Sequence, residues 1–266
     1  MTIPAMRRLL VLAAVLVLLI GIPLFLFPGS TEDSFSWTVR PDLTAAFFGA
    51  GYWAAAVLEM TGARRDRWGD ARIAVPAVAV FTVATLATTV VHLDRFHFDH
   101  PDLVTRVGTW GWLVVYAVVP LLILGALAAQ LRSTGWAERA GASMAVSTRR
   151  GLAAAAAVIG GLGLGLLAAP GLFDAAWPWP LSALTGRAVG AWLAGMGALL
   201  GHMAWDGDWA RSLPASAAAG AFGLLQGIAL VRHLGTPEWS HPASWAYAIA
   251  LVGLFTLGLQ GMRRAA

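Results

Sequence analysis

The sequence predicts an all-α membrane protein with eight transmembrane helices, arranged as two tandem parallel four-helix repeats with pseudo-two-fold symmetry and both termini cytoplasmic. Three observations predict this fold. The 266-residue chain is 58% hydrophobic and only 12% charged, whereas roughly a quarter of the residues in a soluble domain are charged. Eight apolar segments are each about long enough to cross a ~30 Å hydrocarbon core. Motifs of the first half also recur in the second half at a nearly constant spacing.

The first half is expected to supply four spans. The first span follows Arg7 and Arg8, as in a signal peptide, but no small-x-small cleavage site comes after it. The same arginine pair recurs as Arg149 and Arg150 before the fifth apolar segment, so we expect the first segment to be retained as a helix. The four spans are predicted over residues 9–27, 43–62, 73–93 and 107–131.

A linker then separates the halves, and the second half repeats the plan. The stretch 132–150 is rich in Ser, Gly and Arg and lacks apolar periodicity, which predicts a flexible cytoplasmic connection. The remaining spans are expected over residues 152–169, 184–203, 213–234 and 244–262. The predicted organisation is therefore a first transmembrane repeat over 1–131, a linker over 132–150 and a second repeat over 151–266.

The arginines predict the orientation of the chain in the membrane. In this topology, thirteen of the 18 basic residues, all of them Arg, fall in cytoplasmic segments and five fall outside. Because positively charged loops stay in the cytoplasm, both termini are expected on that side. The excess of Arg, Ala and Gly is typical of GC-rich bacterial genomes, which indicates a multi-pass protein of a bacterial plasma membrane.

An internal duplication predicts how the two halves are related. An offset of 142 residues, which becomes 141 after position 42, aligns residues of the two halves in order. Each half has an even number of spans, so both halves enter the membrane in the same direction and their equivalent loops lie on one side. The matched pairs include Arg7 with Arg149, Trp37 with Trp179, Gly49 with Gly190 and His92 with His233.

The loops after the third and seventh spans contain the predicted site. The string VVHLDRFHFDHP of the first half returns as LVRHLGTPEWSHP in the second. Imidazole and carboxylate groups suit Zn, Cu or Fe ions, so a metal ion is the first ligand expected at an outward-facing site. Three matched positions in each copy hold such groups: His92, His97 and His100 in the first, and His233, Glu238 and His241 in the second.

A structural role for these residues is the alternative. The spacing H-x4-H-x2-H is not a recognised metal motif, and interfacial histidines commonly make loop hydrogen bonds and helix caps. Arg95 and Arg232 lie on the outer side against the charge rule, so we expect them to pair with a carboxylate or an anion. The absence of Cys and Lys excludes disulfides, thiolate metal sites and Schiff-base chemistry.

Polar groups at membrane depth are a second source of functional hypotheses. Glu59 lies near the inner end of the second span and Gln226 lies well inside the seventh. Such groups are functional candidates by default. No span carries the succession of carboxylates or histidines that an ion pathway requires, which weakens the interpretation as a pump.

The tandem four-plus-four layout with outward-facing histidines is similar to that of heme A synthases. In that family two four-helix halves also form by duplication and hold heme between histidines, so the resemblance implies a heme-binding redox enzyme. It covers the architecture alone: that family places its heme histidines on even-numbered helices and has cysteines in outer loops, whereas His92 and His233 end odd-numbered spans here. The chain also resembles polytopic membrane proteins of GC-rich bacteria, which implies a location and no activity.

The sequence therefore leaves three functions open and names no reaction. The first is a binding or accessory membrane protein whose outer site holds a metal ion or small ligand. The second is a redox enzyme with b-type heme between the repeats, and the third is a small-molecule or lipid transporter. The expected partners are the lipid bilayer, that ligand and a further membrane protein, but not nucleic acid, because the arginines form no basic stripe.

Overall fold

The computed structural model describes residues 1–133 and 142–265, and over this part it contains helices and no β-strand beyond one isolated bridge between Ser143 and Asp208. Eight of the described helices are long and apolar enough to cross a membrane, so the expected polytopic all-α architecture is confirmed. They are α1 (Pro4–Leu26), α3 (Asp42–Ala63), α5 (Ala74–Val91), α6 (Leu103–Ser133), α7 (Val146–Ala168), α9 (Ala183–Asp206), α10 (Leu213–Arg232) and α11 (Pro242–Ala265).

Shorter helical pieces occupy the connections. Among them, α2 (Thr31–Ser34) follows α1, α4 (Trp68–Ala71) precedes α5, and α8 (Pro170–Phe173) follows α7. Residues 134–141, which form much of the predicted linker, lie outside the described part of the chain.

The helix ends differ from the predicted spans by up to six residues. Helix α7 begins six residues earlier than predicted, at Val146, because backbone hydrogen bonding continues through polar residues that hydropathy assigns to the linker. Helices α5 and α10 end two residues earlier than predicted, at Val91 and Arg232. His92 and His233 therefore lie directly after their helices and begin the loops.

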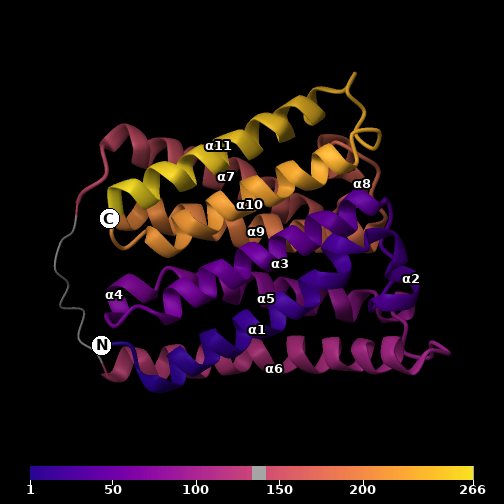
Figure 1. The fold of residues 1–266 in the computed structure, drawn as a ribbon, viewed down its shortest axis with the longest axis horizontal. Coiled ribbons are helices and arrows are strands. Elements are labelled where there is room, and N and C mark those ends of the chain that lie inside the picture. The colour runs from indigo at the N-terminus through magenta and orange to yellow at the C-terminus, as the bar shows by residue number, and fades with distance from the viewer. Residues whose placement is uncertain (134–141, 266) are drawn as a thin grey trace.

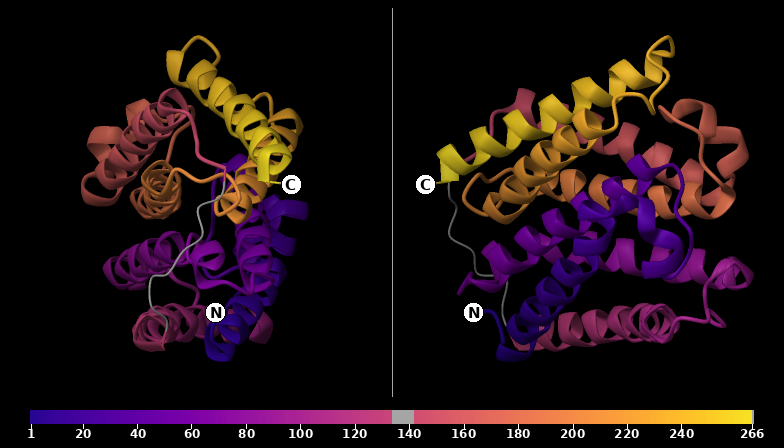
Figure 2. Two further views of the ribbon diagram at one scale, coloured as in Figure 1. Left: turned by 90° about the vertical axis from the view of Figure 1, so that its left-hand side faces the viewer. Right: turned by 45° about the vertical axis from the view of Figure 1, so that its right-hand side comes forward.

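Both chain termini lie at one end of the bundle, which we call the terminal end (Figure 1). The loops after α5 and α10, which contain the histidines, lie at the opposite end, which we call the histidine end. Helices α6 and α11 form opposite flanks of the molecule (Figures 1 and 2).

Four helices form the centre of the bundle and four surround them. The central helices are α3, α5, α9 and α10, whose apolar windows are 50–78% buried, whereas those of α1, α6, α7 and α11 are only 17–28% buried. Helix α3 packs against α10, and α5 packs against α9, so both central contacts join the first half to the second. Helices α1 and α7 cover α3 and α9, and the exposed faces of the outer helices are apolar, as a bilayer requires.

Glycine allows the outer helices to approach the central ones. A Cβ atom built on Gly49 of α3 would lie 2.5 Å from the backbone nitrogen of Phe25 in α1. One built on Gly190 of α9 would lie 2.9 Å from the backbone nitrogen of Leu167 in α7. Any larger residue at these positions would force the backbones apart, which is why small residues mark helix crossings in membranes.

Polar contacts also join the halves inside the bundle. The indole Nε1 of Trp179 donates to Thr44 Oγ1 at 2.8 Å, and the Gln226 amide donates to the Phe47 carbonyl oxygen at 2.8 Å. Gln226 Oε1 accepts from the Tyr247 hydroxyl at 2.9 Å. A buried polar group costs free energy unless it is hydrogen-bonded, so these pairings stabilise one relative placement of the halves. Gln226, a functional candidate from the sequence, is accounted for by these contacts.

Candidate functional site

The two histidine loops begin in the same way. The backbone N–H of His92 donates to the Thr89 carbonyl oxygen, and that of His233 donates to the Leu230 carbonyl oxygen, each at 3.1 Å. Each histidine therefore closes the last turn of its helix.

The last histidine of each loop turns the chain into the next helix. His100 Nδ1 accepts from the backbone N–H of Asp102, and His241 Nδ1 accepts from the backbone N–H of Ala243, both at 3.2 Å. The Asp102 carboxylate in turn accepts from the backbone N–H of Thr105, which lowers the pKa of Asp102 below its ordinary value. These contacts cap the starts of α6 and α11 and match the structural alternative.

The middle positions of the two loops differ. His97 Nδ1 donates to the Phe35 carbonyl oxygen at 2.9 Å, and its Nε2 lies 3.2 Å from Thr38 Oγ1. Both ring nitrogens are thus engaged with the connection that follows α1. Glu238, the matched residue, has an exposed side chain, and its backbone N–H donates to the Pro178 carbonyl oxygen at 3.2 Å.

His92 is held by an arginine of the second half. Its Nε2 lies 2.9 Å from Arg187 Nη1, and Arg187 Nε donates to the Leu167 carbonyl oxygen at the end of α7. A guanidinium group only donates, so His92 Nε2 is the acceptor and the ring is neutral. Burial, followed by the positive charge of Arg187, lowers the pKa of His92, and the Asp94 carboxylate opposes this effect.

His233 has a less complete environment. Its Nε2 is buried and has no hydrogen-bond partner among the described residues. Burial is the main cause that lowers the pKa of His233, Arg232 adds to it, and Asp42 opposes it. Arg232 donates to the Phe25 carbonyl oxygen at 2.6 Å, and its guanidinium carbon lies 5.5 Å from the centroid of the Phe25 ring. The Arg232 charge therefore interacts with the C-terminal end of the α1 dipole and with an aromatic face.

Arg95, the other arginine of the predicted site, forms an exposed ion pair with its neighbour. Its Nε lies 3.0 Å from Asp94 Oδ2, and both side chains are about 70% exposed. An exposed pair of this kind contributes little to stability.

These contacts leave the predicted metal site without structural support. His97 and His100 lie close together, with ring centroids 5.4 Å apart. Over the residues that the structure describes, however, no group of three or more His, Asp or Glu side chains is placed to hold a metal ion. Both ring nitrogens of His97 and the Nε2 of His92 are engaged within the protein in this arrangement. Metal binding at the histidine end stays a prediction.

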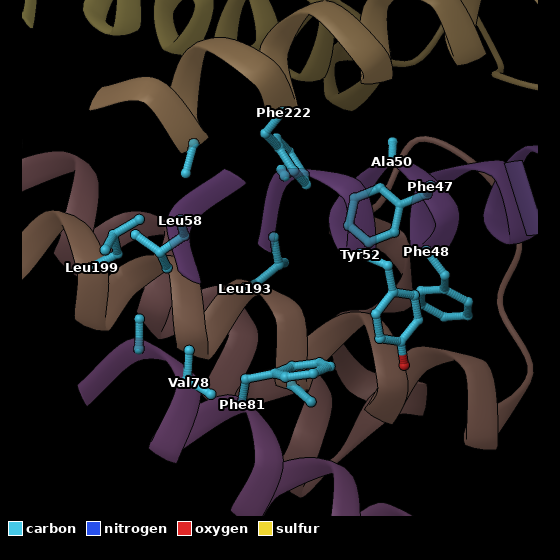
Figure 3. Packing of buried hydrophobic residues seen from close by; sticks show 14 of the residues in the cluster. Phe47, Phe48, Ala50, Tyr52, Leu58, Val78, Phe81, Leu193, Leu199 and Phe222 are labelled. Atoms are coloured by element: carbon cyan, nitrogen blue, oxygen red, sulfur yellow. The ribbon is translucent and has the colours of Figure 1, made fainter. Parts of the chain in front are cut away.

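An apolar cavity lies between the two halves. It has a volume of about 110 Å³ and is lined by residues of α1, α3, α5, α6, α9, α10 and α11. Wall residues from both halves are labelled in Figure 3, including Leu58, Val78, Phe81, Leu199 and Phe222. Trp192 of α9 also lines it and packs against the Phe81 ring, with centroids 4.1 Å apart. The cavity lies in the membrane-spanning part of the bundle, away from the histidine loops.

Glu59 is the only charged residue in the described wall of this cavity. Its side chain is 2% exposed, and its Oε2 has no hydrogen-bond partner among the described residues. Two neighbouring wall hydroxyls are satisfied: Tyr116 pairs with the Tyr52 hydroxyl at 2.8 Å, and Thr82 donates to the Val78 carbonyl oxygen at 2.8 Å. An unpaired carboxyl group in an apolar wall is a chemically distinct position.

Sequence reasoning identified Glu59 as a polar group at membrane depth, but it placed the site at the histidine end. The residues that line the cavity are ordinary apolar residues, and no local pattern distinguishes them from the rest of the core. The pairing of Arg187 with His92, residues 95 positions apart, was also missed.

No protein family model matches this chain, and no curated protein or solved structure resembles it significantly.

Proposed function

We propose that this integral membrane protein binds a lipophilic small molecule or a lipid chain in the cavity between its halves. The observation that carries the proposal is a cavity within the spanning helices whose wall is apolar apart from Glu59 and a few hydroxyl and indole groups. Its volume of about 110 Å³ is somewhat less than the ~150 Å³ of an apolar cavity that holds benzene. The cavity therefore suits an aromatic ring or part of an alkyl chain.

The bilayer is the natural source of such a ligand. Helices α1 and α6 meet at the terminal end, where the Gln130 side chain accepts from the Ile3 backbone N–H and donates to the Met1 carbonyl oxygen. The two helices diverge toward the histidine end (Figures 1 and 2). The cavity residues on this side, such as Val17 and Val119, are only partly buried. A ligand dissolved in the membrane would enter between α1 and α6 without passing through water.

The tandem-repeat symmetry is part of the same proposal. Gly49 against Phe25 and Gly190 against Leu167 are matched helix crossings, and the caps made by His100 and His241 are matched hydrogen bonds. We propose that the repeats span 1–131 and 151–266 and that the cavity lies at their interface. We further propose that the chain lies in a bacterial plasma membrane with both termini cytoplasmic, on the arginine distribution alone.

Photolabelling tests the proposed binding. The protein is reconstituted in lipid nanodiscs with an alkyl diazirine probe, irradiated, digested and analysed by mass spectrometry. Labelling is expected on wall residues that do not face lipid, above all Val78 of α5 and Leu199 of α9, which are 9% and 8% exposed. Labelling confined to outward-facing residues such as Leu121, which is 68% exposed, would refute the proposal.

A cavity-filling variant supplies the control for this experiment. Ala54 of α3 lines the cavity and is 5% exposed, so Ala54→Leu is expected to fill part of the volume and reduce cavity labelling. Ala154 of α7 is exposed on the outer surface, and Ala154→Leu is expected to leave the labelling unchanged. Equal labelling of Val78 in the two variants would argue against an occupied cavity.

The metal ion or small ligand predicted for the histidine end has its own test. Metal analysis of detergent-purified protein, together with thermal stability in the presence of Zn or Cu, decides between the two roles of these histidines. Bound metal that is lost on His97→Ala would favour the predicted site, and an absence of both metal and stabilisation would favour the capping role.

A further inference from the structure

The wall of the cavity is chemically uneven along its length. Helix α3 contributes positions from Gly51 to Glu59, which at 1.5 Å per residue span roughly 12 Å along the helix axis. Glu59 is the wall residue of α3 nearest the terminal end, four positions before the helix ends at Ala63. The apolar part, with Trp192 and Gly51, lies further toward the middle of the bundle.

The Glu59 carboxyl group forms no ion pair within the described part of the protein. No arginine among the described residues forms an ion pair with it. An isolated carboxylate in an apolar environment is costly, whereas a carboxylate paired with a cation or a strong donor is tolerated. A ligand with a cation or a strong hydrogen-bond donor could therefore pair with Glu59, and the apolar remainder of the wall offers no equivalent interaction.

We propose that the ligand of this cavity is a lipophilic amine, whose ammonium group pairs with Glu59 while its alkyl or aryl part lies along the apolar wall toward Trp192. This inference rests on the proposed binding function and specifies the ligand class. A protonated amine supplies the cation that the single acidic group lacks, whereas a carboxylic acid of the same chain length supplies none and would place a second acidic group beside it. A neutral alcohol would be intermediate, because it donates a hydrogen bond without a charge.

Competition against the photolabel tests the expected order of affinities, in which the amine binds more tightly than the alcohol and the alcohol more tightly than the acid. Decylamine, decanol and decanoate are each titrated into nanodiscs of zwitterionic lipid that contain the protein and the diazirine probe. The sample is then irradiated, and the decrease in labelling of Val78 is measured. We expect decylamine to protect at concentrations about 10-fold lower than decanol, the size of effect expected for a charge-assisted pair, with decanoate the weakest. Free probe in protein-free nanodiscs is measured in parallel to correct for partitioning into the bilayer.

Two carboxamide variants separate the role of Glu59 from general attraction of amines. Glu59→Gln keeps the shape of the side chain and removes its charge, so the preference for decylamine over decanol should fall to less than about 2-fold. Asp66→Asn removes an exposed carboxylate at the same end of the molecule, where Asp66 pairs with Arg7, and should leave the preference unchanged.

The outcomes distinguish the two proposals. Cavity labelling with equal protection by all three compounds, or a preference that persists in Glu59→Gln, would overturn the amine assignment and leave the binding function standing. A stronger effect of decanoate than of decylamine would also overturn it. The absence of any cavity labelling would overturn the binding function itself.

Discussion

Removing the Asp206 carboxylate should weaken the contact between the two halves at the terminal end and lower the stability of the protein. Asp206, the last residue of α9, accepts from Arg72 Nη2 at 2.8 Å and from Arg211 Nη1 at 3.1 Å. The side chains of Arg72, Asp206 and Arg211 are 7%, 3% and 11% exposed. Arg72 belongs to the first half and Asp206 to the second, so the Arg72–Asp206 pair is a buried ion pair between the halves.

The magnitude follows from the burial. Removing one partner of a buried ion pair costs about 3–5 kcal/mol. For a chain of this size, each kcal/mol corresponds to about 2–4 °C in Tm, so Asp206→Ala should lower Tm by roughly 6–20 °C. The matched control is Asp66→Ala, which breaks the Arg7–Asp66 pair, also 2.8 Å long but 43% and 77% exposed. Exposed pairs contribute about 0–1 kcal/mol, so that variant should shift Tm by no more than about 4 °C.

Thermal unfolding in detergent, followed by tryptophan fluorescence, measures both variants. A high-salt series adds a second criterion, because salt screens the exposed pair and leaves the buried one nearly unchanged. Equal Tm shifts for Asp206→Ala and Asp66→Ala would refute the assignment of a buried ion pair between the halves.

Two further predictions concern packing and pH. Gly49→Ala should destabilise the protein by about 1–3 kcal/mol through overpacking. In the control Gly125→Ala the new Cβ would meet nothing within 4 Å, so that variant should be neutral or stabilising. Equal Tm values for the two variants would contradict the close helix crossing at Gly49. The lowered pKa of His92 means that the unfolded chain takes up a proton more readily than the folded one. The associated stability is therefore complete above the ordinary histidine pKa of about 6.5 and is lost as the pH falls through the lowered folded-state pKa. Arg187→Gln removes one cause of the lowering, so the fall in Tm between about pH 7.5 and about pH 5 should be smaller in this variant, and an unchanged pH profile would count against the His92–Arg187 contact.

The sequence by itself determined the class of fold and the positions of the spans. Low charge and long apolar runs are local properties, and a helix that crosses a bilayer must satisfy its own backbone groups, so the run and the helix coincide. The prediction was least accurate at the ends, as at α7, because hydropathy reports the apolar part of a helix and backbone hydrogen bonding continues beyond it. The even number of spans in each half also predicted that the loops after α5 and α10 would lie at one end of the molecule, as they do.

The tertiary structure alone decided what the polar residues do. The partners of His97 lie about 60 residues away in the sequence, at Phe35 and Thr38, and the partner of His92 lies in the other half. Whether a histidine offers a free nitrogen depends on these distant contacts, and spacing within its own loop does not report them. The cavity also depends on contacts between distant segments, because it lies where α3 packs against α10 and α5 packs against α9. Glu59 is a distinct position in its wall because no described residue pairs with its Oε2. Hydropathy is read along the chain, whereas voids and hydrogen-bond partners arise between segments, which is the physical reason why the sequence predicted the spans and only the packed bundle located the cavity.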